Sequence, residues 1–240
     1  MEKSYKTFFY KGRLGADVTL DGTEHHHLAN VRRCKVDEVV VLLCGDEFDY
    51  RYKITSIARD QTKLQFISKE KNKRNPKIEL VVYMGLIRLE NLSWVIEKLG
   101  EIGATELVPF TCARSNVLTS TVNLTRLQGI AEQSCKQSGR SIPLKVSPVL
   151  TFNEMLSQIP DFDAVFYADR GEKRAKITSL TSGKMQKVGL VLGPEGGLTL
   201  EENFEIASRA TPITLGMRTL RSETAAIVGT TLILASLGEL

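Results

Sequence analysis

The sequence has no apolar run long enough to cross a membrane, and its first residues lack the apolar core of a secretory signal peptide. It has only 4 cysteines in 240 residues, and no two of them form a C-x-x-C pair. This spacing argues against a zinc site or a disulfide framework. We therefore expect a cytoplasmic protein with reduced thiols and no metal centre.

Two common nucleotide-binding patterns are also missing. The glycine-containing segment Gly193–Gly197 lacks the Gly-Lys-Ser/Thr ending of a phosphate-binding P-loop. Its glycines are also wrongly spaced for the G-x-G-x-x-G pattern of dinucleotide-binding enzymes. Neither a P-loop enzyme nor a Rossmann dehydrogenase is therefore supported.

The positive charge of the chain is unevenly distributed. The formal net charge is +4; residues 1–75 have 15 Lys and Arg against 11 Asp and Glu, whereas residues 76–240 have 17 of each. A basic surplus confined to one part of a chain is typical of a nucleic-acid contact, although solvated lysines produce the same imbalance.

The first 70 residues contain short β-type segments separated by turn signals. The expected strands are Asp17–Leu20, Glu38–Leu43, Tyr50–Ile57 and Lys63–Ile67. Strands at this spacing indicate a small closed or half-closed barrel. The charged segment 69–76 has few apolar residues and is the best candidate for a linker.

From Ile78 onward, strands and helices alternate. The expected strands are Ile78–Met84, Thr105–Phe110, Ala164–Ala168, Val188–Leu192 and Pro212–Leu215. The expected helices include Leu92–Leu99 and Thr125–Gln137. This alternation predicts an α/β domain with a mostly parallel sheet covered on both faces.

Two glycine-containing loops near the C-terminus each connect a strand to a helix. After the first loop, Gly193–Gly197, we expect Thr199 to cap a helix, with Glu202 completing a capping box. After the second loop, Gly216–Arg221, we expect Ser222 to cap a terminal helix. Parallel strands end at one edge of a sheet, so both loops are expected where open α/β sheets bind ligands.

These loop residues resemble the signature of a known family. The segments Leu192–Leu198 (Leu-Gly-Pro-Glu-Gly-Gly-Leu) and Leu215–Ala225 (Leu-Gly-Met-Arg-Thr-Leu-Arg-Ser-Glu-Thr-Ala) closely resemble those of the RsmE family. Members of that family are S-adenosylmethionine-dependent methyltransferases of the SPOUT superfamily. They methylate N3 of a uridine in bacterial small-subunit (16S) ribosomal RNA.

The resemblance spans nearly the whole chain. His26–Arg33 is similar to the family's His-His…Val-Leu-Arg segment, with Arg32 in place of the usual leucine. Glu97–Pro109 is similar to its Lys-x-x-Glu-Leu-Gly helix and strand. Arg88 stands where the family commonly has lysine, and arginine can replace the charge of lysine but not its geometry.

The resemblance implies a SPOUT trefoil-knot methyltransferase domain over residues 73–240 and a small PUA-like β-barrel that binds RNA over residues 1–72. It also implies a homodimer, for which the apolar helix Ala225–Leu237 is a candidate interface, although core packing explains that helix equally well. The implied cofactor is S-adenosylmethionine. The residues expected to bind it are Leu192, Gly193, Pro194, Glu195, Gly196, Gly197, Leu215, Gly216, Met217 and Leu220.

The implied reaction needs an activated acceptor, because N3 of uracil has a proton at neutral pH. Glu223 or Glu195 would remove that proton as a general base. Alternatively, Arg221 or Arg218 would stabilise the resulting anion. We favour the arginines, because ordinary surface carboxylates are weak bases; the candidate catalytic residues are thus Arg221, Glu223 and Arg218.

Contacts with RNA phosphates are expected from exposed cations. The candidates are Arg32, Arg33, Lys35, Arg88, Arg114 and Arg140. The run His25–His27 is interpreted as part of a strand, in which neighbouring side chains point to opposite faces, and this argues against a shared metal ion.

Two other functions fit parts of the pattern. SPOUT enzymes that methylate the ribose 2′-oxygen usually have a Ser-Leu-Asn motif at the start of the last helix, where this chain has Leu-Arg-Ser-Glu-Thr from Leu220. A non-catalytic RNA-binding protein would not need the intact glycines of the two loops. The favoured partner is small-subunit ribosomal RNA, either naked or in the assembled subunit.

Overall fold

The computed structural model describes residues 5–169, 171–172, 175, 177 and 185–240. The chain forms two compact units. Unit 1 comprises residues 1–75 and 135–143, and unit 2 comprises residues 76–134 and 144–240. No local sequence pattern indicates that residues 135–143 belong with unit 1, and the domain boundary after residue 72 stays a prediction.

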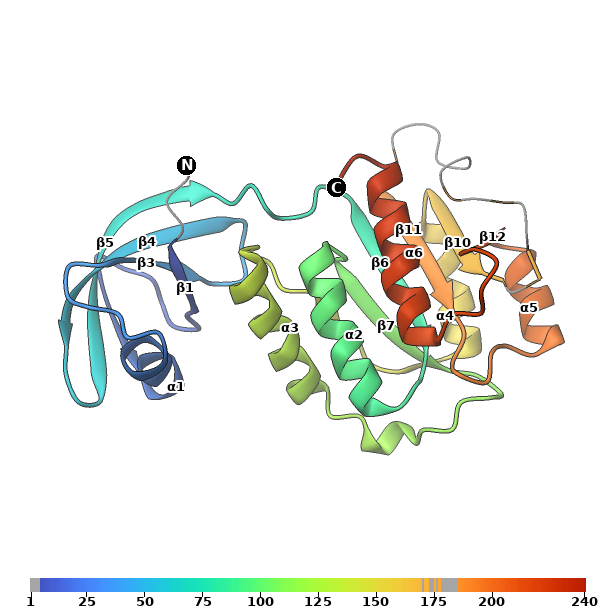
Figure 1. Ribbon diagram of the computed structural model, residues 1–240, viewed down its shortest axis with the longest axis horizontal. Helices are drawn as coiled ribbons and strands as arrows, with labels where there is room; N and C mark the ends of the chain where they lie inside the picture. The colour runs from blue at the N-terminus through green and yellow to red at the C-terminus, as the bar shows by residue number, and fades with distance from the viewer. Residues whose placement is uncertain (1–4, 170, 173–174, 176, 178–184) are drawn as a thin grey trace. The chain divides into compact units, whose positions relative to one another are not determined.

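Unit 1 is built on a curled five-stranded sheet (Figure 1). Its strand order is β1-β3-β4-β5-β2, and only the β1–β3 pair is parallel. The strands are β1 (Lys6–Phe9), β2 (Asp17–Asp21), β3 (Val39–Leu43), β4 (Phe48–Ile57) and β5 (Gln61–Lys71). The order leaves β1 and β2 at the two edges, so the sheet forms a half-barrel.

The interior of unit 1 follows from the alternation of side chains along its strands. In β4, Tyr50, Tyr52 and Ile54 point inward and are buried. Arg51 and Lys53 lie between them and form ion pairs on the outer side. A period of two residues is what a strand with one buried face requires.

The interpretation of the three histidines as part of a strand is wrong. His25 and His26 end helix α1 (Gly22–His26), and His27 begins a π-helical turn, η1 (His27–Val31). His25 is buried, with its Nδ1 atom 2.8 Å from the Thr62 hydroxyl, whereas His26 is exposed. A helix was missed here because the segment is short and polar and gives a weak periodic signal.

Polar contacts join residues 135–143 to the rest of unit 1. Lys136 forms an ion pair with Glu24, and both side chains are largely buried. The Asn72 side chain donates to the Gly139 carbonyl at 2.8 Å, and that of Asn75 donates to the Ser141 hydroxyl at 2.8 Å. Unit 1 therefore includes the segment 135–143, which follows residues 76–134 of unit 2 in the sequence.

Unit 2 contains a seven-stranded sheet in which every strand pair of the described residues is parallel. The strand order is β12-β10-β11-β6-β7-β8, and β9 also pairs with β7. The strands are β6 (Glu79–Gly85), β7 (Glu106–Thr111), β8 (Lys145–Val146), β9 (Leu150–Thr151), β10 (Ala164–Ala168), β11 (Lys187–Leu192) and β12 (Thr211–Ile213). The predicted parallel sheet is confirmed.

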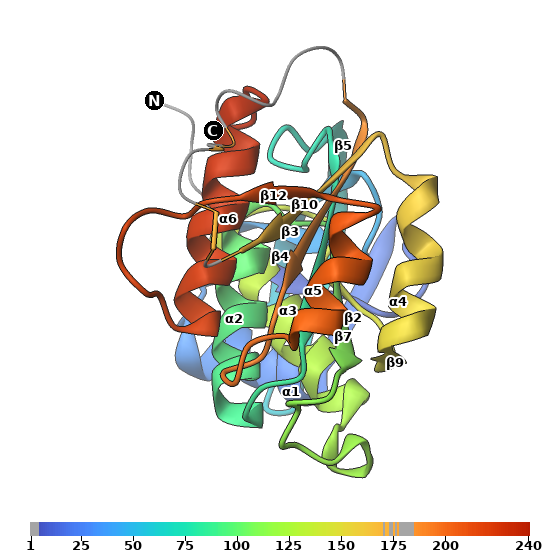
Figure 2. The ribbon, with the colours of Figure 1, turned by 90° about the vertical axis from the view of Figure 1, so that its right-hand side faces the viewer.

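Helices cover both faces of this sheet, as predicted (Figure 2). They are α2 (Leu89–Ile102), α3 (Leu124–Ser138), α4 (Phe152–Gln158), α5 (Leu200–Ala207) and α6 (Ser222–Ser236), with 3-10 turns η2 (Thr119–Thr121) and η3 (Ile159–Asp161). Within β6, Val82 and Met84 pack in the core that includes α2 and α6 residues, and Val81 and Tyr83 pack toward α4 and α5. Burial on both faces accounts for the continuous apolar strands.

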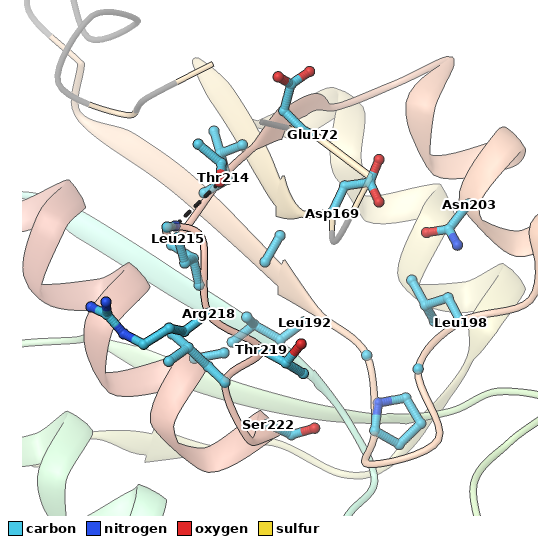
Figure 3. A pocket seen from close by; sticks show the side chains of 18 of the residues that line it. Asp169, Glu172, Leu192, Leu198, Asn203, Thr214, Leu215, Arg218, Thr219 and Ser222 are labelled. Atoms are coloured by element: carbon cyan, nitrogen blue, oxygen red, sulfur yellow. Dashed lines mark hydrogen bonds between the residues drawn. The ribbon is translucent and has the colours of Figure 1, made fainter. Parts of the chain in front are cut away.

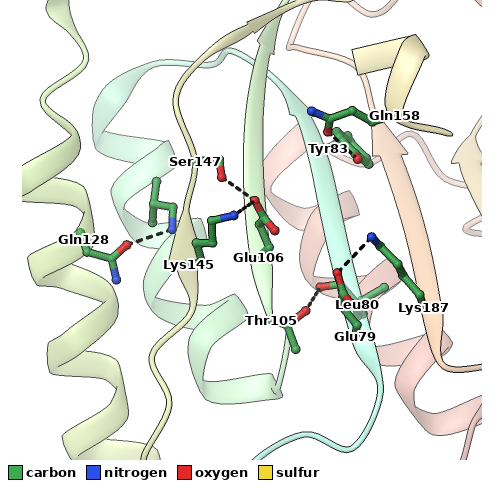
Figure 4. Close-up of polar contacts among 11 residues, drawn as sticks. Glu79, Leu80, Tyr83, Thr105, Glu106, Gln128, Lys145, Ser147, Gln158 and Lys187 are labelled. Carbon is green, nitrogen blue, oxygen red and sulfur yellow. Dashed lines mark hydrogen bonds and ion pairs between the residues drawn. The ribbon is translucent and has the colours of Figure 1, made fainter. Parts of the chain in front are cut away.

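At the amino-terminal edge of the sheet, ion pairs join the first residues of neighbouring strands (Figure 4). Lys187 at the start of β11 lies 3.4 Å from Glu79 at the start of β6. Lys145 at the start of β8 lies 2.9 Å from Glu106 at the start of β7, which also accepts a hydrogen bond from Ser147. The charges at this edge are satisfied within the protein.

The opposite edge includes a close approach between strand and loop. Gly85 ends β6, and a Cβ atom added to it would lie 2.4 Å from Cδ of Pro194. Such a distance is far below van der Waals contact, so only glycine fits without movement of the loop.

No helix in the described part of the chain is long and apolar enough to cross a membrane.

We expect Gly85→Ala to destabilise unit 2 by about 1–3 kcal/mol, because the added methyl group overpacks against Pro194. The measurement is chemical denaturation followed by circular dichroism. Gly129→Ala is the matched control: Gly129 lies within α3, an added Cβ atom would meet nothing within 4 Å, and alanine favours the helix. Equal stability of the two variants would contradict the close approach.

Candidate functional site

A cavity of about 260 Å³ opens at the carboxyl ends of β10, β11 and β12 (Figure 3). This is close to the lower end of the range for small-molecule sites, roughly 300–1,000 Å³. Its lining residues come from both glycine-containing loops, the strand ends, the chain after β7, and helices α5 and α6: Arg114, Ala168, Asp169, Glu172, Leu192, Gly193, Pro194, Gly196, Gly197, Leu198, Asn203, Ile213, Thr214, Leu215, Gly216, Met217, Arg218, Thr219, Leu220, Ser222 and Ala225.

The first loop turns sharply after β11. The Gly197 amide donates to the Pro194 carbonyl at 2.8 Å, and Gly197 has a φ of +71°, which favours glycine. Thr199 then caps α5 in a capping box with Glu202, as predicted. The Glu202 carboxylate also accepts the Ala113 amide at 2.8 Å, which connects the start of α5 to the chain after β7.

The second loop also depends on a glycine in the left-handed region. Gly216 has a φ of +111°, and its amide donates to the Thr214 hydroxyl at 3.2 Å. The predicted cap of the last helix is wrong: α6 begins at Ser222, Arg221 is its N-cap residue, and that residue makes no side-chain capping bond. Ser222 is buried in the first turn of α6 and lines the cavity instead.

The structure brings together nine of the ten residues expected to bind the cofactor. Leu192, Leu215 and Leu220 form apolar wall, and the glycines leave backbone groups accessible. The exception is Glu195, which is exposed, does not line the cavity and accepts the Arg88 amide at 3.2 Å. Ligand binding by these residues stays a prediction.

The three candidate catalytic residues are divided between the cavity and its margin. Arg218 lines the cavity, and its guanidinium extends away from the side where Asp169 and Asn203 lie (Figure 3). Arg221 does not line it; its side chain is 85% exposed, with Nη1 3.9 Å from Oε1 of Glu223. The other Glu223 oxygen is buried and accepts no hydrogen bond from the described residues.

The candidate RNA-binding residues lie in different surroundings. Arg32, Arg33 and Lys35 are exposed in unit 1, in the chain that follows η1. Arg88 is exposed at the N-terminus of α2.

Two of the RNA-binding candidates lie where the sequence did not suggest. Arg140 is only 2% exposed, and burial lowers the pKa of its guanidinium, so this side chain is not available to a phosphate in the structure. Arg114 lines the cavity, and its Nη1 donates to the carbonyls of Gly196 at 3.0 Å and Leu198 at 3.3 Å. These two hydrogen bonds from Arg114 therefore hold the first loop in place.

Sequence reasoning missed the acidic part of the cavity wall. Asp169 directly follows β10, and Glu172 lies three residues further on. The available signal was positional: Ala164–Ala168 was expected as a parallel strand, so the residue after it belongs at the ligand-binding edge. Asn203, on α5, was also missed.

Comparison with known proteins gives a consistent family. Residues 73–234 match the model of an RNA methyltransferase domain, and residues 20–67 match that of an RNA methyltransferase PUA domain. The chain is 30% identical over 219 residues to ribosomal RNA small subunit methyltransferase E of Bacillus subtilis, with 86% of this chain and 85% of that protein covered. It is 27% identical over 239 residues to the Synechocystis protein of the same name, with 95% and 78% covered.

A solved structure shows the same fold. Ribosomal RNA small subunit methyltransferase E from Neisseria gonorrhoeae, bound to S-adenosylmethionine, superposes with a TM-score of 0.85 at 22% identity. The match covers 97% of this chain and 98% of that one.

We expect Arg114→Ala to loosen the first loop without unfolding unit 2. Loss of two hydrogen bonds, each contributing about 1 kcal/mol, should speed amide exchange at residues 193–198 by roughly tenfold or more. Hydrogen exchange with mass spectrometry measures this. Arg126→Ala, which removes an exposed arginine of α3, is the control; equal exchange in both variants would exclude the bracing role.

Proposed function

The chain belongs to the ribosomal RNA small subunit methyltransferase E family, and we propose that it transfers a methyl group from S-adenosylmethionine to N3 of one uridine in small-subunit ribosomal RNA. The observation that carries the proposal is the cavity between the two glycine-containing loops at the carboxyl edge of the sheet. The enzyme would act in the cytoplasm, where ribosomal subunits are found.

The wall chemistry of the cavity suits this cofactor. Leu192, Leu215 and Leu220 offer apolar surface for an adenine ring, and the loop amides offer donors and acceptors. Gly197 and Gly216 keep the backbone open at positions where a side chain would be strained. The Neisseria gonorrhoeae relative, which has the same fold, is bound to S-adenosylmethionine. When bound, the cofactor supplies a methyl group attached to a positively charged sulfur.

The residues at the start of α6 would prepare the acceptor. Arg221 is exposed beside the cavity and free to approach a base, and a cation there would stabilise the negative charge that develops on the uracil oxygens as N3 loses its proton. Glu223 would hold that arginine in place, since one of its oxygens already lies 3.9 Å from Nη1. Arg218, on the cavity wall, is the second cation available.

Unit 1 would bind the RNA through its exposed basic segment after η1. Arg32, Arg33 and Lys35 lie there between two exposed apolar residues, Val31 and Val36. Arg33 has a φ of +48°, and this left-handed conformation costs any residue other than glycine about 1–2 kcal/mol. Strain of this kind concentrates at functional positions, which supports a role for the Arg33 side chain.

We also propose that the enzyme is a homodimer formed through α6 and that the loops of unit 2 are threaded as a trefoil knot. The support for the dimer is that α6 is mostly apolar and has no single polar face. Ile227, Val228 and Leu232 are only half-buried within one chain. A helix with that composition is normally buried all round.

The function is tested by mass mapping of small-subunit ribosomal RNA after incubation with the protein and labelled S-adenosylmethionine. The substrate is small subunits from a strain that lacks its own uridine N3-methyltransferase. One methyl group on the base of one uridine is expected. Label on a ribose would favour a 2′-O-methyltransferase instead, and no label together with no cofactor binding would leave only an RNA-binding protein.

We expect Arg221→Ala to lower the methylation rate by about 100-fold, as the loss of one anion-stabilising donor does in other enzymes, with little change in cofactor affinity. Single-turnover assays and calorimetry separate the two. Arg126→Ala again provides the control. A larger loss in Glu223→Gln than in Arg221→Ala would contradict the assignment, because it would identify Glu223 as the general base.

We expect Arg33→Gly to weaken RNA binding while leaving the melting temperature unchanged or raised, because glycine relieves the backbone strain as it removes the cation. The slope of log affinity against log salt concentration should decrease by the amount expected for the loss of about one phosphate contact. Asp37→Gly is the matched control: Asp37 has a φ of +73° in the same segment but has no cation to lose. A similar loss of RNA affinity in both variants would contradict the phosphate contact.

A further inference from the structure

The second glycine-containing loop has a large apolar side chain at its tip. Residues 216–219 are all exposed, whereas Leu215 and Leu220 on either side of them are half-buried, and Leu215 packs against the core of unit 2. Met217 is 93% exposed, more than any other large apolar residue in the described part of the chain. The loop therefore projects into solvent with a methionine that unit 2 leaves almost uncovered.

The surroundings of Met217 distinguish it from other exposed apolar residues, which are common on protein surfaces and assign no function by themselves. Met217 lines the cavity, and two exposed arginines, Arg218 and Arg221, follow it in the same loop. An apolar side chain with cations beside it can contact a nucleic-acid base and the neighbouring phosphates together.

The charge of the loop favours nucleic acid as its partner. Residues 216–221 include two arginines and no acidic residue. The first acid after them, Glu223, has a side chain that is only 12% exposed. Asp169 and Glu172 also line the cavity, but they belong to the chain after β10 and not to this loop. The tip of the loop is therefore basic and apolar, which suits a polyanion with flat apolar bases.

The proposed reaction makes a demand on the RNA that such a side chain can meet. N3 lies on the edge of uracil that forms base pairs, so a paired and stacked uridine cannot present it to the cavity. Enzymes that modify bases take the target out of its stack, which leaves the neighbouring base without a stacking partner. Apolar side chains, methionine among them, insert between bases in other nucleic-acid complexes.

We propose that the Met217 side chain stacks on the RNA base next to the target uridine and so keeps that uridine turned toward the cavity. Arg218, whose guanidinium extends away from the side of Asp169 and Asn203, would contact a phosphate of the same strand (Figure 3). The inference rests on the proposed function. It gives the Met217 side chain a contact with substrate RNA in place of the cofactor contact that the sequence suggested.

The first test compares Met217→Gln with Met217→Leu on small subunits that lack the methyl group. Glutamine is close to methionine in length but polar, and because the side chain lies in solvent neither change disturbs the core. We expect single-turnover methylation at saturating S-adenosylmethionine to slow by about tenfold or more in Met217→Gln and by less than about threefold in Met217→Leu. The affinity for S-adenosylmethionine, measured by calorimetry, should change by less than about twofold in both variants.

Leu200→Gln is the matched control. Leu200 is the first residue of α5 and is 83% exposed, so the same change removes a similar apolar side chain from the surface of the same unit. Its neighbours on α5 include the exposed acids Glu201 and Glu205, which repel phosphates. Methylation by this variant should match the wild type. Equal slowing in Leu200→Gln and Met217→Gln would contradict a specific role for Met217.

The second test identifies what lies against the side chain. A photoreactive diazirine amino acid is placed at Met217, the protein is irradiated with small subunits, and the crosslinked nucleotide is mapped by reverse transcription. We expect a crosslink to a nucleotide next to the methylated uridine. A crosslink to a second copy of this chain, to a ribosomal protein or to RNA elsewhere would overturn the inference, and so would no crosslink.

The two tests separate this inference from the proposed function. Parallel losses of cofactor affinity and methylation in Met217→Gln would overturn the inference, because they would identify a contact with the cofactor. If the wild type methylates a uridine base and Met217→Gln does so equally fast, only the inference fails. If the wild type methylates no uridine base, the proposed function fails, and the inference fails with it.

Discussion

The parallel direction of the strands in unit 2 is the constraint on which the rest of the site depends. Because β10, β11 and β12 all run the same way, their last residues meet at one edge, although the chain between them covers almost fifty residues. Two loops that are distant in sequence are thereby placed side by side. Burial of the sheet on both faces maintains that arrangement, since displacement of an apolar strand from between the helices would expose its side chains to water.

The two edges of this sheet have opposite chemistry, and that difference explains where the ligand site is. At the amino-terminal edge, the ion pairs Lys187–Glu79 and Lys145–Glu106 use the charges of the first strand residues within the protein. At the carboxyl edge, the two loops contain glycines and the chain turns sharply, so backbone groups remain accessible to a ligand. In the chain after β7, Arg114 then holds the first loop, and the Ala113 amide holds Glu202 at the start of α5.

Much of this arrangement was predictable because it depends on local patterns with a direct physical cause. Continuous apolar segments identified the strands, and Thr199 with Glu202 identified the start of α5. The same capping pattern at Thr151 and Glu154 begins α4, which was not predicted, because its apolar positions are few. Residues 135–143 join unit 1, and Arg114 donates a hydrogen bond to the first loop. Both are contacts between segments that are distant in the sequence, so no local pattern indicates them. Asp169 was missed because only the strand before it, and not its own residue type, marks the position.

The central claim is that S-adenosylmethionine binds between the two glycine-containing loops of unit 2. The most direct test is a crystal structure of the full chain grown with S-adenosylmethionine. The account predicts cofactor density in the cavity between the two loops, residues 193–197 and 215–220. An empty cavity at saturating cofactor, or density at another place on the protein, would contradict it.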